Sequence, residues 1–317
     1  MKNQVPPKEL QPAWAYYGFA EEPFNLKPDP KFLFLAPSHW EAFHNMLAGV
    51  NERKGIIVVC GEVGIGKTIL IYALLKDLDE KIKTSFVYQT RLSFEDILRN
   101  LLIDLEGPLF KEKEGLGSLV FHLKNYLKQS IRPQENVAVV IDEAQSLDEA
   151  VLVDLLNMVP ADFPGANPLQ ILLVGHPELE EKLDSDRLRL VKKNIGVVSR
   201  IKPLNGEEIW EYLKHRAKVA GGNAAQVFTK EAVKVIEKFS GGNPRLINIL
   251  CNRALLVGHL SSSPVIDKKI IRQSTKDLDY FTPPQSQRPS FRLLFLLFSG
   301  LVFLFSLTFL IIHLLRR

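Results

Sequence analysis

A glycine-rich segment at residues 61–68 has the residue types and the spacing of a phosphate-binding loop. It matches the pattern G-x-x-x-x-G-K-[ST], in which the glycines let successive backbone N–H groups turn toward phosphate oxygens. The lysine of this pattern reaches the β- and γ-phosphates, and the hydroxyl after it binds Mg²⁺. The predicted nucleotide-binding residues are Gly61, Glu62, Val63, Gly64, Ile65, Gly66, Lys67 and Thr68, with Thr68 also a metal ligand.

The flanking sequence separates a phosphate site from an ordinary glycine turn. The apolar run at residues 55–60 reads as a buried strand that ends at the loop, and residues 68–79 have apolar positions at helical spacing. A helix that begins near Lys67 adds the positive end of its dipole to the site. This context favours the binding of ATP together with Mg²⁺.

The acidic pair Asp142–Glu143 directly follows another apolar strand candidate, residues 137–141. Asp142 can hold Mg²⁺, directly or through water, and Glu143 can orient and deprotonate the attacking water. Acidic pairs are common at strand ends, so this pair alone is weak evidence for a nucleotide site. It supports such a site because the chain also contains the phosphate-binding loop. Together the two motifs predict ATP hydrolysis by positioning and charge neutralisation rather than by covalent chemistry.

The elements that must position these motifs alternate between strand and helix patterns. In residues 119–127, for example, the apolar positions fall on one helical face. Such alternation predicts an α/β core with a parallel sheet covered on both sides. After Pro203 the strand signals stop, and two or three amphipathic helices are expected. The strand candidates are residues 55–60, 85–89, 137–141, 169–174 and 195–201, and the later helices are residues 207–220, 229–239 and 244–260.

The C-terminal region contains an apolar run, residues 293–315, without a single Asp, Glu, Lys or Arg. As a helix, 23 residues span roughly 34 Å, enough to cross a hydrocarbon core of about 30 Å. A buried core helix is the alternative, but core helices rarely lack a polar face for so long. We therefore expect one transmembrane helix. Arginines flank the run on both sides, so the charge distribution does not determine its orientation.

Bulk composition excludes several other classes. The net charge of +4 is too close to balance to indicate a nucleic-acid-binding protein on electrostatics alone. The two cysteines, Cys60 and Cys251, provide neither a disulfide framework nor a zinc pattern. Residues 1–12 contain no apolar stretch of the kind found in a secretory signal.

Five segments together resemble the AAA+ ATPases of the general secretion pathway protein A (ExeA/GspA-like) family. In chain order they read PFNLKPDPKFLFLAPSHWEAF, CGEVGIGKT, VIDEAQSL, LLVGHPEL and SGGNPRLINILCNRALL, and the similarity runs from about residue 16 to residue 258. The resemblance implies an AAA+ core with a helical lid, and an ATPase domain on the cytoplasmic side of a bacterial inner membrane. It also implies a homo-oligomer that helps to assemble secretion or cell-envelope machinery.

Two further site residues come from this resemblance. His176, in LLVGHPEL, stands where the family usually has a glutamine that senses the γ-phosphate; the alternative is a hydrogen-bonded structural histidine. Arg245, in SGGNPRL, matches the lid arginine that contacts phosphate; the alternative is an arginine that caps its own helix. The predicted catalytic residues are therefore Lys67, Glu143, His176 and Arg245, and the predicted metal ligands are Thr68 and Asp142.

The sequence departs from the family in two places. Asn194 stands where the family has an arginine that could act on a neighbouring subunit; the nearby arginines are Arg187, Arg189 and Arg200. Hydrolysis is therefore expected to be slow or to depend on a partner. Relatives often continue into a periplasmic domain that binds peptidoglycan, whereas this sequence stops two residues after the apolar run. The chain is therefore expected to act on its partners through the cytoplasmic domain or the membrane helix.

The leading hypothesis is a single-pass membrane protein that hydrolyses ATP to drive or switch the assembly of a secretion or envelope complex. One alternative is a regulator of DNA transposition, although the basic pairs Lys192–Lys193 and Lys268–Lys269 read as solvated faces and the membrane helix argues against DNA. Another alternative is a nucleotide-dependent scaffold with little turnover. The expected parts are an N-terminal arm (1–45), an α/β core (46–205), a helical lid (206–279), a linker (280–292) and a transmembrane helix (293–315).

Overall fold

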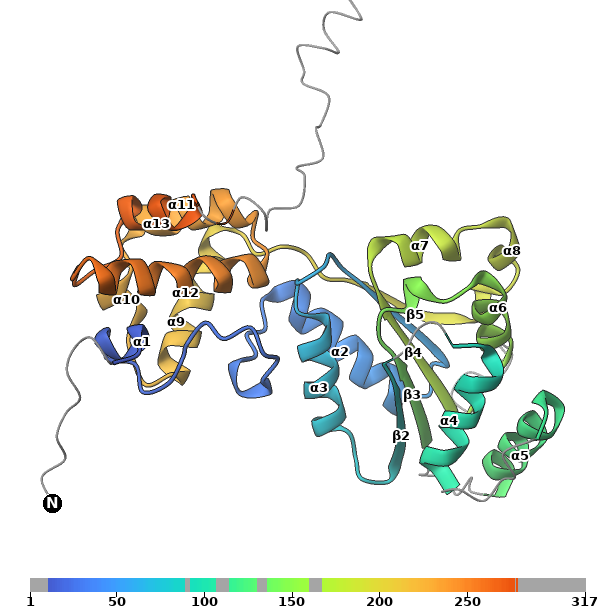
Figure 1. Ribbon diagram of the computed structural model, residues 1–317. Coiled ribbons are helices and arrows are strands. Elements are labelled where there is room, and N and C mark those ends of the chain that lie inside the picture. The colour runs from blue at the N-terminus through green and yellow to red at the C-terminus, as the bar shows by residue number, and fades with distance from the viewer. Residues whose placement is uncertain are drawn as a thin grey trace, which may run out of the picture. The chain divides into compact units, whose positions relative to one another are not determined.

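The computed structural model describes residues 11–88, 92–106, 114–129, 136–159, 167–276 and 278 (Figure 1). The chain separates into two compact units, residues 1–276 and 277–317, and the features described below belong to the first. The predicted linker (280–292) and transmembrane helix (293–315) lie outside the described residues. Within the described ranges, no helix combines the length and the apolar character needed to cross a membrane.

A parallel sheet of five strands forms the centre of the core, in the order β2-β3-β4-β1-β5. The prediction of a parallel α/β core is therefore confirmed. The three inner strands are buried at every position, which is why each one reads as an apolar run. The strands are β1 (Ile56–Cys60), β2 (Ile82–Val87), β3 (Asn136–Ile141), β4 (Leu169–Gly175) and β5 (Ile195–Arg200).

The predicted position of the second strand was wrong. It was placed at residues 85–89, whereas β2 starts at Ile82, which pairs with Asn136. Strand β2 lies at one edge of the sheet, so Lys83 and Thr84 are exposed and carry polar side chains. The apolar run that was used as the signal therefore covers only the later part of the strand.

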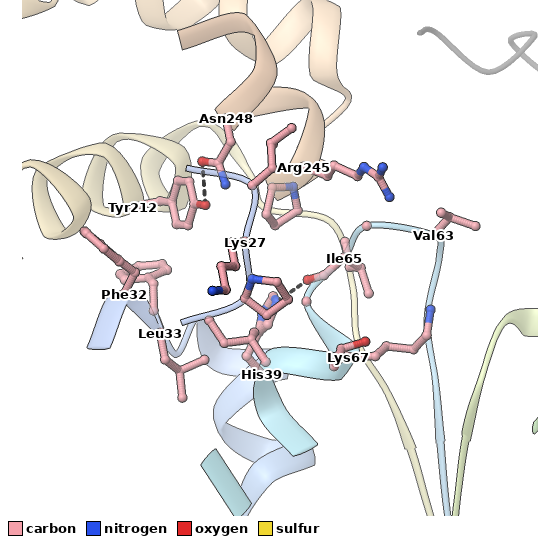
Figure 2. Close-up of a pocket in the computed structure, with 18 of the residues that line it drawn as sticks. Lys27, Phe32, Leu33, His39, Val63, Ile65, Lys67, Tyr212, Arg245 and Asn248 are labelled. Atoms are coloured by element: carbon pink, nitrogen blue, oxygen red, sulfur yellow. Dashed lines mark hydrogen bonds between the residues drawn. The ribbon is translucent and has the colours of Figure 1, made fainter. Parts of the chain in front are cut away.

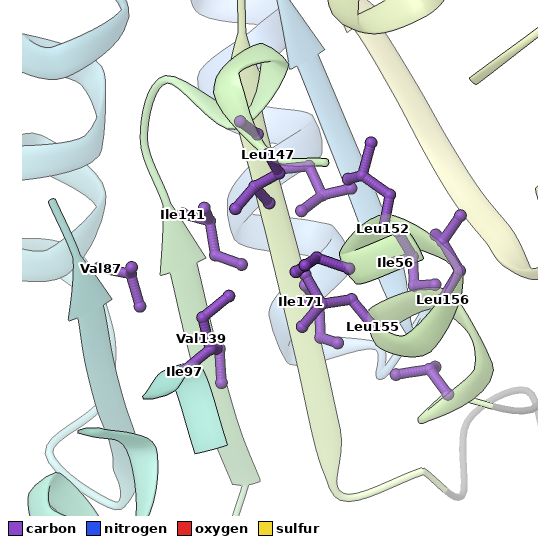
Figure 3. Packing of buried hydrophobic residues seen from close by; sticks show 14 of the residues in the cluster. Ile56, Val87, Ile97, Val139, Ile141, Leu147, Leu152, Leu155, Leu156 and Ile171 are labelled. Carbon is purple, nitrogen blue, oxygen red and sulfur yellow. The ribbon is translucent and has the colours of Figure 1, made fainter. Parts of the chain in front are cut away.

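Helices cover both faces of the sheet. On one face α2 (Pro37–Asn51) and α3 (Lys67–Asp77) pack over a cluster that includes Ile57 and Val59. On the other face α4 (Phe94–Glu106), α5 (Leu116–Gln129) and α6 (Glu149–Asn157) pack over Ile56, Val139 and Ile171, as Figure 3 shows for α6. Alternate residues of β1 thus enter opposite halves of the core, as the pleat of a strand requires.

Two short helices, α7 (Pro177–Leu183) and α8 (Asp186–Arg189), connect β4 to β5. Beyond Pro203, the described residues form a helical domain, referred to here as the lid. The number of helices predicted for this domain, two or three, was too low. The prediction lacked α10, which is a single turn, and α13, which is short and polar. The lid helices are α9 (Gly206–Val219), α10 (Ala224–Val227), α11 (Lys230–Ser240), α12 (Pro244–Leu260) and α13 (Lys268–Thr275).

The segment before α2 runs along the lid. It contains α1 (Ala13–Tyr16) and a 3₁₀ turn at Pro30–Phe32. The Ala20 amide donates to the Ala220 carbonyl over 2.8 Å, and Arg216 Nε donates to the Pro23 carbonyl over 2.5 Å. The N-terminal arm and the lid are therefore joined through backbone groups, although about 190 residues of chain separate them.

A buried amide network ties the strands together at the edge opposite the phosphate-binding loop. Gln170, with no exposed surface, accepts the Gly55 amide proton over 2.6 Å through Oε1 and donates through Nε2 to the Asn167 carbonyl over 2.7 Å. Its Nε2 also lies 3.3 Å from Asn136 Oδ1, and Asn136 Nδ2 donates to the Val50 carbonyl over 2.7 Å. Every amide group in this network therefore has a partner.

We expect Gln170→Leu to lower the free energy of unfolding by about 1–3 kcal/mol, because the buried Gly55 N–H and the Asn167 carbonyl lose their partner. Urea denaturation of the full-length chain in detergent, followed by circular dichroism, measures the change. The control is Gln226→Leu, at an exposed position of α10. Equal midpoints for the two variants would contradict the role assigned to the network.

Candidate nucleotide-binding site

Three inner strands bring the predicted site residues to one edge of the sheet. Because the strands are parallel, the carboxyl ends of β3, β4 and β1 meet there. Gly61 follows β1, Asp142 follows β3 and His176 follows β4. Strand β4 lies between the other two, so His176 is positioned between the loop and the acidic pair.

The loop at residues 61–68 depends on two glycines with left-handed backbone conformations. Gly64 has φ +77° and Gly66 has φ +112°, angles at which a side chain would be strained. A Cβ atom on Gly64 would also lie 2.7 Å from Cβ of Arg245 in the lid. Gly64 is therefore required both for the curl of the loop and for the close approach of the lid.

Lys67 is the first residue of α3, and its ammonium group lies inside the curl of the loop. The side chain is 5% exposed, and Nζ donates to the carbonyls of Gly61 over 2.8 Å and of Glu62 over 3.0 Å. Burial lowers the pKa of Lys67, while the carboxylates of Glu143 and Asp142 oppose that shift. The cation is thus held where the loop N–H groups would receive phosphate oxygens.

Thr68 and Asp142 meet directly, although 74 residues separate them in the chain. The Thr68 hydroxyl donates to Asp142 Oδ2 over 2.9 Å, and the Glu143 amide donates to Oδ1 over 2.9 Å. Burial raises the pKa of Asp142, and these two hydrogen bonds oppose the rise. The prediction that Thr68 and Asp142 belong to one site thus has a geometric basis.

These two oxygen donors suit Mg²⁺, which prefers hard oxygen ligands and usually keeps phosphate oxygens and waters in its shell. Across the described ranges, no group of three or more His, Cys, Asp or Glu side chains could hold a metal ion. That result does not conflict with Mg²⁺, because one hydroxyl and one carboxylate are all that this chain would contribute. When bound, the ion would neutralise charge on the phosphates.

Glu143 is held in an uncommon conformation by two neighbours. Its backbone is left-handed, with φ +54°, which costs energy for a residue with a side chain. Its Oε2 accepts from Gln145 Nε2 over 2.6 Å and lies 3.2 Å from His176 Nε2. The strained backbone therefore directs this carboxylate toward the end of β4.

Gln145 determines which nitrogen of His176 carries the proton. The His176 amide donates to Gln145 Oε1 over 3.0 Å, which identifies the other amide atom as the nitrogen. This Nε2 lies 3.2 Å from His176 Nδ1, and because an amide nitrogen only donates, Nδ1 must accept. His176 is therefore neutral, and its Nε2–H points to Glu143. Gln145 lies in the segment VIDEAQSL, but the sequence analysis did not single it out.

The lid docks on the loop through the start of α12. Asn243 Nδ2 donates to the Val63 carbonyl over 2.7 Å, and the Arg245 amide donates to the Gly64 carbonyl over 3.2 Å. Asn243 Oδ1 also caps α12 by accepting from the Arg245 and Leu246 amides. The cap of this helix is thus Asn243, and the exposed Arg245 side chain extends from the lid above the loop (Figure 2).

A pocket of about 360 Å³ lies between the loop, the lid and the N-terminal arm. No motif in the sequence predicted the side of this pocket that is formed by the arm and the lid, although the arm portion lies within the segment PFNLKPDPKFLFL. Its mixture of apolar side chains and polar groups suits a nucleoside. The missed lining residues are Asn25, Leu26, Lys27, Pro28, Phe32, Leu33 and Phe34 of the arm, and Tyr212, Arg216 and Asn248 of the lid (Figure 2).

Two groups outside the motifs stabilise this pocket. His39 of α2 is buried, and its Nε2 lies 2.9 Å from the Ile65 carbonyl in the loop. Burial lowers the pKa of His39, and because a carbonyl oxygen only accepts, Nε2–H donates to the loop. On the lid side, the Tyr212 hydroxyl donates to Asn248 Oδ1 over 2.8 Å, and the Arg216 guanidinium lies over the Phe32 ring at 4.6 Å.

The region of the missing family arginine contains no substitute at the same position. Asn194 Nδ2 donates to the Leu156 carbonyl over 2.8 Å, so this side chain serves the core. Arg200 is engaged by Glu180, with Nε 2.7 Å from Oε2. Arg187 and Arg189 of α8 are exposed, and within the described residues neither forms an ion pair. Of the three nearby arginines, these two are therefore the ones that could contact a neighbouring copy.

Fold and site together define an AAA domain with a phosphate-binding loop, and the family model described as AAA domain matches residues 50–183. Within this class the chain is a relative of general secretion pathway protein A. It is 30% identical over 248 residues to that protein of Aeromonas hydrophila, a match that covers 78% of this chain and 45% of the relative. The chain is therefore similar to general secretion pathway protein A over most of its own length, in agreement with the resemblance noted from its sequence. It spans about half the length of the curated relatives it matches.

Solved structures share this architecture at low sequence identity. The ORC2 protein of Aeropyrum pernix, in ADPNP-ADP complexes, aligns with a TM-score of 0.61 at 18% identity, over 83% of this chain and 72% of that one. Cdc6p of Pyrobaculum aerophilum aligns with a TM-score of 0.61 at 17% identity, over 80% of this chain and 70% of that one. At such identities the likeness supports the fold alone.

We expect Gly64→Ala to weaken ATP binding by about tenfold or more, because the left-handed backbone and the contact with Arg245 each resist a Cβ atom. Titration of the full-length chain with a fluorescent ATP analogue measures the dissociation constant. Gly117→Ala is the matched control, since a Cβ there meets no atom within 4 Å. Unchanged affinity in the Gly64 variant would contradict the proposed role of the loop.

Proposed function

We propose that this chain is a membrane-anchored AAA+ ATPase that binds and hydrolyses ATP, with Mg²⁺, to drive or switch the assembly of a secretion or cell-envelope complex. The observation that carries the proposal is the 2.9 Å contact between Thr68 and Asp142, with Lys67 and Glu143 beside it. A hydroxyl, a carboxylate, an ammonium and a second carboxylate at one edge of a parallel sheet are the groups that phosphoryl transfer to water uses.

Each residue has a separate role in this proposal. The loop N–H groups and Lys67 bind the phosphates and offset their charge, and Thr68 with Asp142 hold Mg²⁺. Glu143 orients the attacking water and accepts its proton. The neutral His176 donates to Glu143 and, as the residue at the end of β4, senses the γ-phosphate. Arg245 reaches the phosphates from the lid, whose position is coupled to the loop through Asn243.

The membrane anchor rests on the sequence of residues 293–315. ATP is cytoplasmic, so the ATPase domain faces the cytoplasm in a single-pass arrangement, and we place the protein in a bacterial inner membrane. The similarity to general secretion pathway protein A supports a role in secretion or envelope assembly. The partners are other copies of this chain together with proteins of that complex.

A second candidate function is a nucleotide-dependent scaffold with little turnover. The specific observation in its favour is that Glu143 already accepts hydrogen bonds from Gln145 and lies against His176. Both contacts are made to Oε2 of the carboxylate, which is then not free to face an attacking water. Glu143 would then act as a base only after a rearrangement, for example one produced when a partner binds.

The first test is ATP turnover by the full-length chain in lipid nanodiscs. We expect Glu143→Gln to reduce turnover by about 10²-fold or more while ATP affinity stays within a few-fold, because the substitution removes the base and keeps the shape. Glu181→Gln, at an exposed position of α7, is the control. Tight ATP binding without turnover by the unmodified chain, at every protein concentration, would contradict the ATPase and support the scaffold.

The second test addresses assembly between subunits. We expect Arg187→Gln with Arg189→Gln to lower turnover by about tenfold or more and to leave ATP affinity unchanged, because these exposed cations would act on the site of a neighbouring copy. Turnover per chain should also rise with protein concentration in the unmodified protein. Lys193→Gln removes a nearby exposed charge as a control. Turnover that is independent of concentration and of both arginines would contradict a contribution in trans.

A further inference from the structure

The lid carries the positive charge of this protein. Residues 206–276 contain twelve Lys or Arg and six Asp or Glu, a net charge of +6 in a chain whose total is +4. The other residues together are therefore slightly acidic. Because of this charge difference, an anionic partner surface would attract the lid but not the rest of the chain.

The cations concentrate on two neighbouring helices, α11 and α13, which pack against each other and against α12 (Figure 1). Each helix buries one apolar face, with Ile236 in α11 and Ile271 in α13. The charged positions are spaced mainly four residues apart and all are exposed. They are Lys230, Lys234 and Lys238 of α11, and Lys268, Lys269, Arg272 and Lys276 in and directly after α13.

Acidic side chains do little to offset this surface, referred to here as the basic lid face. Within the described residues, none of its seven cations forms an ion pair with a carboxylate. Glu231 lies in the first turn of α11, where it complements the helix dipole, and Asp267 caps α13 by accepting from the Lys269 and Ile270 amides. The Glu237 carboxylate lies against Gly206 at the start of α9, since a Cβ on Gly206 would be 2.8 Å from its Oε2.

Two exposed apolar side chains lie at the end of α12 and shortly before α13. Leu260, at the end of α12, is 76% exposed, and Val265, three residues before Lys268, is 40% exposed. Leu260 is the last residue of α12, and Val265 lies in the segment that connects α12 to α13. Cations beside exposed aliphatic side chains are the combination found on protein surfaces that bind membrane interfaces, where lysines meet head groups and aliphatic groups enter the acyl boundary.

We propose that the basic lid face, with Leu260 and Val265, binds the anionic head groups of the membrane that anchors this chain. The inference rests on the proposed membrane anchor. Seventeen residues lead from Lys276 to Leu293, a span of at most about 60 Å when fully extended. The length of this connection limits how far the end of the lid can lie from the proposed anchor. This tether and the exposed aliphatic residues favour a lipid surface over a nucleic acid, which would also attract the cations.

The test uses the full-length chain in nanodiscs of phosphatidylcholine, with and without phosphatidylglycerol. A fluorophore on Gln273→Cys, at an exposed position of α13, reports contact through quenching by head-group spin labels. Cys60 and Cys251 are buried, so the introduced thiol is labelled selectively. We expect quenching that is several-fold stronger with phosphatidylglycerol and that decreases with salt, because the attraction is electrostatic.

A charge-matched pair of variants separates the basic lid face from charge in general. Lys268→Gln, Lys269→Gln and Arg272→Gln together should abolish the phosphatidylglycerol-dependent quenching. The control set Lys76→Gln, Lys83→Gln and Lys124→Gln removes three exposed cations from the core and should retain it. Equal quenching in neutral and anionic nanodiscs would overturn the proposal. An equal loss of quenching in the lid variant and in the core control variant would also overturn it.

Resistance to alkaline extraction from membranes tests the anchor separately. A chain that resists extraction but shows no lipid-dependent quenching keeps the anchor and refutes the lid contact. A chain that is extracted, yet floats with phosphatidylglycerol vesicles only when the lid cations are present, refutes the anchor and retains the contact. Quenching that duplex DNA abolishes at low salt, with DNA binding lost in the lid variant, would assign the surface to nucleic acid instead.

Discussion

The parallel register of β3, β4 and β1 is the constraint on which the site depends. It places the ends of three strands at one edge, so that residues far apart in the chain approach within hydrogen-bond distance. Thr68 meets Asp142 over 2.9 Å, and His176 reaches Glu143 over 3.2 Å from the strand between them. A shift of one residue in any of these strands would turn its buried side chains to the opposite face and separate these groups. The apolar cores on both faces of the sheet therefore protect the chemistry as well as the fold.

The remaining walls of the pocket come from segments outside the sheet. The arm reaches the lid through backbone hydrogen bonds such as Ala20 to Ala220, and the lid reaches the loop through Asn243 and Val63. A ligand that contacts all three segments would stabilise their mutual arrangement, because its binding energy is available only when they are together. In our proposal this is how nucleotide state is transmitted to the lid. The basic lid face lies on α11 and α13 of the same helical domain, which would connect nucleotide binding to contact with the membrane.

The conformation of Glu143 shows how the structure restrains the proposed base. A left-handed backbone at a residue with a side chain persists only when its surroundings compensate for the cost. Here Gln145 donates a hydrogen bond to the carboxylate, and His176 Nε2 lies 3.2 Å from the same oxygen. The same contacts fit a proposed base that is positioned in advance and released by a further event. The inward-facing Asn194 is consistent with activation that depends on cations elsewhere, such as Arg187 and Arg189.

The sequence alone determined the features that arise from local physics. The loop at residues 61–68, the buried strands and α12, whose predicted limits match the structure, follow from glycine conformations, apolar runs and the Asn243–Pro244 helix start. Local signals failed where burial is one-sided or polar residues dominate, as at the edge strand β2 and in α13. Only the tertiary structure revealed that Gln145 sets the tautomer of His176, that His39 supports the loop and that the arm lines the pocket. These contacts join residues distant in sequence, and no local pattern encodes which strand ends and loops the packed core will bring together.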